Sequence, residues 1–126
     1  MEAYHFCAID SKGDVILRDG NIVEPGATEI FEDPVFICKS GLHASKHVFD
    51  ALQYAPGPML RLVECSDIVE EQNDKFVCRK RVELARIDAS RLLREFACDC
   101  AERVLPIFEK EYPNDKRPRQ AIEVLL

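Results

Sequence analysis

The sequence lacks the local motifs of several large enzyme classes. It has no glycine-rich phosphate loop, no serine nucleophile elbow and no H-E-x-x-H segment. Its beginning shows neither the basic start nor the apolar run of a secretory signal. The longest uncharged stretch, Ala51 to Leu60, is too short to span a bilayer. We therefore expect a soluble, cytoplasmic protein without a membrane partner.

The six cysteines include no paired C-x-x-C motif. Without an export signal a disulfide framework is not expected, so we interpret the thiols as reduced. Four of them fall inside apolar strand patterns and are expected to fill the core: Cys7, Cys38, Cys65 and Cys78. Cys98 and Cys100 lie two apart, about 200° around a helix, and cannot face one ion.

A zinc site could use Cys38, His43 and His47, because thiolate and imidazole are zinc ligands. A closed structural site needs four converging ligands. The fourth would have to be His5, Cys7 or Cys65, and no paired C-x-x-C motif supplies two of the four. We therefore expect no metal. His43 could instead orient its turn through a backbone hydrogen bond.

Net charge is −6, but the charge is divided unevenly along the chain. Residues 1–74 carry 14 acidic and 5 basic side chains, whereas residues 75–126 carry 9 acidic and 12 basic ones. An acidic surface repels phosphate backbones and steers association with basic protein partners. We expect Glu29, Glu32 and Asp33 to belong to such a binding surface, although surface acids can also serve solubility alone. No basic cluster has interleaved aromatics, so direct nucleic-acid binding is not expected.

Strand patterns dominate residues 1–88. The expected strands are Tyr4–Asp10, a hairpin over Val15–Val23, Val35–Cys38, Met59–Cys65 and Lys75–Ile87. Met59–Cys65 has apolar residues at both odd and even positions, and therefore on both faces of the strand, which indicates an interior strand. In Lys75–Ile87 the alternation places Arg81 and Glu83 on the polar face, and Lys80 breaks the pattern and could mark a bulge. Glu29–Asp33 is expected to be loop.

Helical periodicity covers one short segment and the last part of the chain. Ser45 is the expected N-cap of a short helix, and Asp88 that of a long one. The apolar stripe expected along the long helix is Leu92, Leu93, Phe96, Cys100, Val104, Ile107 and Phe108. Pro106 should kink this helix or begin another, and Pro118 suits the first turn of a last helix.

These patterns predict an α+β fold in a single domain, 1–126. We expect a mainly antiparallel N-terminal sheet with one inserted helix (1–88), packed against C-terminal helices (89–126).

Two segments carry family resemblances. Tyr4-His5-Phe6, the run Cys38-x-Ser40-Gly41-Leu42-His43-Ala44, and Tyr54 before a strand with Glu64 together resemble uncharacterised phage and prophage proteins. This likeness spans residues 4–88, and its most specific element is the S-G-[L/F]-H-A motif, with Cys38, Gly41 and His43 as its characteristic residues. The tail from Phe96 to Glu123 resembles immunity proteins of bacteria.

Both resemblances imply mobile-element biology. Small proteins in that setting bind and block a toxin or a bacterial defence complex, as anti-CRISPR proteins do. We therefore predict stoichiometric binding of a protein partner, with no catalytic residue and no cofactor. The oligomeric state is left open.

A distant resemblance to ADP-ribosyltransferases suggests an enzymatic alternative. Gly41 through Val63 is similar to the glycine-led strand, helix ending in Tyr-Ala, and following strand of that fold. The resemblance implies NAD as cofactor. It would give catalytic roles to His5, Ser45, Tyr54 and a carboxylate such as Glu64 or Glu83, although fold analogy alone does not establish function.

Overall fold

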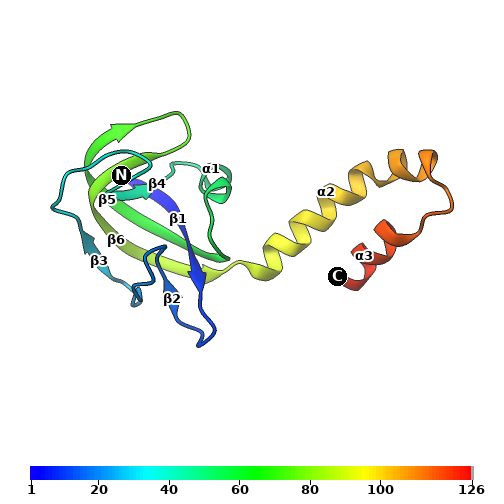
Figure 1. The fold of residues 1–126 in the computed structure, drawn as a ribbon, viewed down its shortest axis with the longest axis horizontal. Helices are drawn as coiled ribbons and strands as arrows, with labels where there is room; N and C mark the ends of the chain where they lie inside the picture. The colour runs from blue at the N-terminus through cyan, green and yellow to red at the C-terminus, as the bar shows by residue number, and fades with distance from the viewer. Residues whose placement is uncertain (126) are drawn as a thin grey trace. The chain divides into compact units, whose positions relative to one another are not determined.

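Strands form the first part of the chain and helices the last, so the predicted α+β class is confirmed (Figure 1). The computed structural model describes residues 1–125. The strands are β1 (Glu2–Ile9), β2 (Val15–Ile16), β3 (Thr28–Ile30), β4 (Leu42–Ala44), β5 (Met59–Glu71) and β6 (Phe76–Asp88). The helices are α1 (Val48–Gln53), α2 (Ser90–Glu111) and α3 (Arg117–Leu125). The chain consists of two compact units, Met1–Asp88 and Ala89–Leu126.

The first unit is a curled antiparallel sheet in the order β2-β1-β5-β6-β3, and β4 pairs with β6 off this path. Register shifts between Leu62 and Val63 and between Ile68 and Glu70 interrupt the long β5–β6 ladder. Such bulges bend and twist the strands that carry them. The expected bulge at Lys80 is wrong, because Lys80 pairs with Ser66 in regular register.

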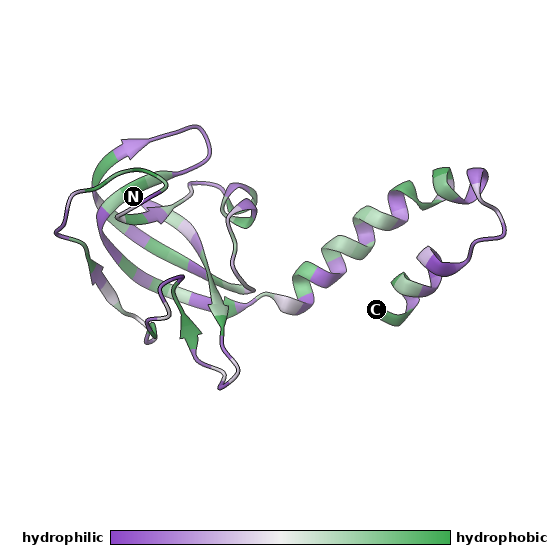
Figure 2. Cartoon of the chain, in the orientation of Figure 1, coloured by the Kyte–Doolittle hydropathy of each residue, from purple (hydrophilic) through white to green (hydrophobic). Residues whose placement is uncertain are grey.

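Strand β5 lies between β1 and β6, which confirms its prediction as an interior strand. Apolar and polar residues alternate along the long strands (Figure 2). The core cluster around β5 consists of Ala3, Ala44, Val63, Cys65, Phe76 and Cys78. The hairpin over Val15–Val23 is also confirmed, since the Val23 N–H donates to the Val15 carbonyl at 2.8 Å.

Three local predictions in this unit are wrong. Val35–Cys38 is not a strand but leads into a turn closed by a Phe36–Ser40 bridge, and the strand β4 follows Gly41 instead. Part of the expected loop Glu29–Asp33 belongs to β3, because Thr28–Ile30 finds a partner in β6. Ser45 does not cap α1: its backbone pairs with Tyr4, and the N-cap is His47.

The second unit is a pair of helices whose contact face differs from the expected stripe. Cys98 and Leu105 of α2 are buried together with Ile122 of α3. Of the expected stripe, Val104 is 59% and Ile107 72% exposed. The difference arises because α3 packs on the neighbouring face of α2. This packing buries Cys98 and leaves Cys100, which was expected in the stripe, exposed.

Helix α2 begins one residue later than predicted, with Ala89 as N-cap, and runs through Pro106 without ending there. Pro118 lies in the first turn of α3, as predicted. Packing of the helices against the sheet, on which the single-domain prediction rests, stays a prediction. None of the helices over residues 1–125 has the length and apolarity needed to cross a membrane.

Candidate functional site

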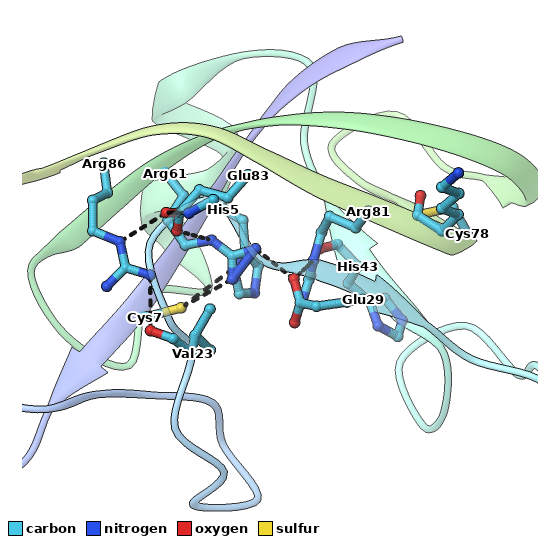
Figure 3. A network of polar contacts seen from close by, with 12 residues as sticks. His5, Cys7, Val23, Glu29, His43, Arg61, Cys78, Arg81, Glu83 and Arg86 are labelled. Carbon is cyan, nitrogen blue, oxygen red and sulfur yellow. Dashed lines mark hydrogen bonds and ion pairs between the residues drawn. The ribbon is translucent and has the colours of Figure 1, made fainter.

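A network of buried charges lies inside the curled sheet (Figure 3). The side chains of Arg61, Arg81 and Glu83 are 0%, 3% and 2% exposed. Arg81 donates through Nε and Nη2 to the two carboxylate oxygens of Glu29, both at 2.9 Å. Arg61 pairs with the same carboxylate, and Arg86 pairs with Glu83 at 2.9 Å. Buried charges are stable only when they are paired in this way.

The strand register explains the network. Glu29 of β3 lies directly opposite Arg81 of β6. Arg61 and Arg86 also lie opposite each other, and the Glu83 carboxylate interacts with both of these like charges. The Nε of Arg61 is 3.1 Å from Oε1 of Glu83 but outside hydrogen-bond geometry, so charge rather than an aligned hydrogen bond holds that contact.

The network bears on two expectations. Alternation placed Arg81 and Glu83 on the polar face of β6. The curl of the sheet encloses that face, so these residues form internal salt bridges, and it leaves Leu84 50% exposed. Glu29 is not part of an exposed acidic surface, because its side chain is only 12% exposed and is paired with two arginines. Glu32 and Asp33 are exposed, and their binding role stays a prediction.

Beside the network lies a cavity of about 590 Å³. It brings together six of the residues singled out in the sequence: His5, Cys38, Gly41, His43, Ser45 and Tyr54. Four cationic residues that sequence reasoning did not assign to a site also line it: Arg18, Lys39, Lys75 and Arg81. No sequence pattern could have grouped these cations, because they come from separate turns and strands.

His43 holds the turn that carries the S-G-L-H-A motif. Its Nε2 accepts the Cys38 backbone N–H at 2.9 Å. Burial lowers the pKa of His43. A hydrogen bond between its ring and the backbone of Gly41 raises this pKa, because a carbonyl acceptor favours the protonated ring. The imidazole is therefore neutral, with both nitrogens engaged, and it has the turn-orienting role.

The glycine of the motif is required by both conformation and space. Gly41 has φ +100°, in the region that L side chains rarely adopt. A Cβ at this position would lie 2.5 Å from Cγ2 of Val77 and 3.0 Å from Cγ1 of Val35. The glycine thus lets the turn pack directly against β6. Cys38, expected in the core, is exposed on this turn with φ 69°.

The other cavity residues are held in defined states. Burial, and then the charges of Arg81 and Arg61, lower the pKa of His5 well below its usual value, so its ring is neutral at pH 7. Tyr54 donates its hydroxyl to Asp74, and this hydrogen bond is the main reason that the pKa of Tyr54 is raised. The Lys75 ammonium lies 4.4 Å from the centre of the Tyr54 ring.

Neither carboxylate of the enzymatic alternative lines the cavity. Glu64 pairs with the Met1 ammonium at 2.6 Å and is 47% exposed. Glu83 is buried in the charge network. The structure therefore gathers His5, Ser45 and Tyr54 without the acid that transferase chemistry would need, and use of NAD stays a prediction. In the described part of the chain no group of three or more metal-binding side chains is placed to hold an ion.

Comparison with known proteins gives two family matches. Residues 83–126 match a family described as Imm-5 like putative immunity protein, so the predicted likeness of the tail to immunity proteins is confirmed. Phage origin stays a prediction. No curated protein and no solved structure matches the chain. Residues 1–95 match a second family model, which covers most of the 126 residues. The chain therefore belongs to the family described as Domain of unknown function (DUF7666).

Proposed function

We propose that this protein acts by binding a protein partner in a fixed ratio, as an immunity protein or inhibitor. The observation that carries the proposal is the match of residues 83–126 to an immunity-protein family. The matched segment comprises the end of β6 and the whole helical unit. A helix pair is a common platform for recognition, because it presents side chains at fixed spacing on a rigid backbone.

The contacts within the helical unit support such a platform. Beyond the buried cluster of Cys98, Leu105 and Ile122, Arg119 donates two hydrogen bonds to Glu109 at 2.6 and 3.0 Å. Bidentate pairs of this kind fix geometry as well as adding energy. They hold α3 against α2 and define the face that a partner would meet.

Two exposed apolar side chains on α2 supply anchors of the kind that dominate interfaces. Val104 and Ile107 are three residues apart, on adjacent positions of one helix face. Their exposed fractions, 59% and 72%, are large for apolar groups. Buried apolar anchors surrounded by polar residues contribute most of the binding energy in typical interfaces.

The finer proposal is that the partner is a cytoplasmic bacterial toxin or defence complex, in a mobile-element setting. The exposed acids Glu32 and Asp33 of the sheet unit would steer a basic surface of that partner. Because the steering is electrostatic between exposed groups, it should weaken as salt rises.

A pull-down of the tagged full-length chain from bacterial lysate, followed by mass spectrometry and reconstitution of the purified pair, tests the proposal. Light scattering should give a fixed ratio. The V104D/I107D variant should lose capture, and the matched control V69D, at a 48% exposed valine of β5, should keep it. Reversal of Glu32 and Asp33 to lysine should reduce capture mainly at low salt. Equal capture by all folded variants would contradict the proposal.

A further inference from the structure

Three cations from separate turns line the cavity of the sheet unit. Arg18 lies in the turn closed by the Gly20 N–H to the Leu17 carbonyl, Lys39 follows Cys38, and Lys75 ends the β5–β6 turn. None of the three forms an ion pair with a carboxylate among the residues that the structure describes. Arg81 also lines the cavity, but its charge is matched by Glu29.

Few carboxylates belong to the cavity lining itself. Within residues 1–125, Asp19 is the one carboxylate in its lining, and that carboxylate already accepts two hydrogen bonds from Asn21. With Arg81 neutralised by Glu29, the lining carries a formal excess of two positive charges. This is opposite to the chain as a whole, whose net charge is −6. A cleft lined by one sign of charge concentrates ligands of the other sign.

The rest of the lining suits an organic group. It includes four residues with aromatic side chains, Tyr4, Phe6, Phe31 and Tyr54. The Tyr54 ring is held by the Lys75 ammonium on its face and by Asp74 at its hydroxyl. A volume of about 590 Å³ lies within the usual range for organic ligands and far exceeds what an inorganic anion fills.

We propose that this cavity binds a small phosphorylated organic molecule. Arg18, Lys39 and Lys75 contact its phosphate, and the aromatic lining receives its organic body. A phosphate monoester carries nearly two negative charges at pH 7, which matches the excess of two positive charges better than a single carboxylate does. The site lies in the sheet unit and does not depend on the partner binding proposed for the helices.

Calorimetric titration of the full-length chain tests the proposal with four probes: phenyl phosphate, AMP, inorganic phosphate and adenosine. Phenyl phosphate or AMP should bind, and more tightly than either inorganic phosphate or adenosine. K39M and K75M should each weaken binding about 10-fold, since each removes one charge-assisted contact. The control K12M removes an equal charge at an exposed lysine outside the lining and should leave binding unchanged.

Within residues 1–125 the Lys39 ammonium forms no ion pair, so K39M removes no salt bridge from the fold and separates loss of binding from loss of fold. Failure of both organic phosphates to bind at about 10 mM would overturn the proposal. Equal weakening by K12M would show that overall charge, and not the cavity, attracts the anion. Equal affinity for inorganic phosphate and the organic phosphates would overturn the role of the aromatic lining.

Discussion

The buried charge network predicts that Glu83 is required for stability and that Glu64 is not. Glu83 is 2% exposed, interacts with Arg61 and Arg86, and accepts the Gly26 N–H at 2.8 Å. E83Q keeps the shape of the side chain but removes its charge, so that only one carboxylate remains in the network beside three arginines. Breaking a buried ion pair from one side costs about 3–5 kcal/mol.

This cost is large beside the free energy of unfolding of a typical domain, about 5–15 kcal/mol. For a unit of this size it should lower Tm by more than about 10 °C. Urea and thermal unfolding followed by far-UV circular dichroism would measure it. The matched control is E64Q, at a carboxylate that is 47% exposed and pairs with the Met1 ammonium, for which about 0–1 kcal/mol is expected. A free energy of unfolding of E83Q that lies within about 1 kcal/mol of the unsubstituted protein's, which is the cost expected for an exposed ion pair, would refute the reasoning.

Three further predictions concern the motif, the helical unit and the enzymatic alternative. G41A should lower the free energy of unfolding by more than the control G13A, since both positions have positive φ but only at Gly41 does a Cβ meet other atoms; equal effects in urea melts would contradict this. The side-chain hydrogen bond from Arg117 lowers the pKa of Asp115 to about 2, so the contact is fully present above the ordinary value of 3.8 and is lost as pH falls through about 2; NMR should record this midpoint and its return toward 3.8 in R117Q. No transfer from labelled NAD to lysate proteins is expected, and transfer that disappears in a folded E64Q protein would favour the transferase.

Several features were predictable because they depend on local chemistry. The interior position of β5 follows from the apolar residues on both of its faces. The division at residue 88 follows from the change of period from two to 3.6. The role of His43 in its turn was one of the open alternatives and needed only contacts within five residues, with Cys38 and Gly41.

Other features were not predictable, because they depend on which segments meet. The alternation in β6 places Arg81 and Glu83 together on one face, but it does not say that the curled sheet encloses that face. Arg61 interrupts an apolar strand, and its burial is tolerable because it pairs with Glu29, 32 residues away, and with Glu83. In α2, helical spacing identified an apolar stripe, but the position of α3 selected the face that contains Cys98.

The sequence alone determined the α+β class and the order of a mainly β part before a helical part, since both follow from residues that are neighbours in the chain. Only the tertiary structure decided that acidic and basic residues of β3, β5 and β6 neutralise one another inside the sheet, and that cations of three turns line one cavity. The physical reason is that the energy of a charge depends on its burial and on its partners. Both are set by strand pairing across the whole sheet and by its curl.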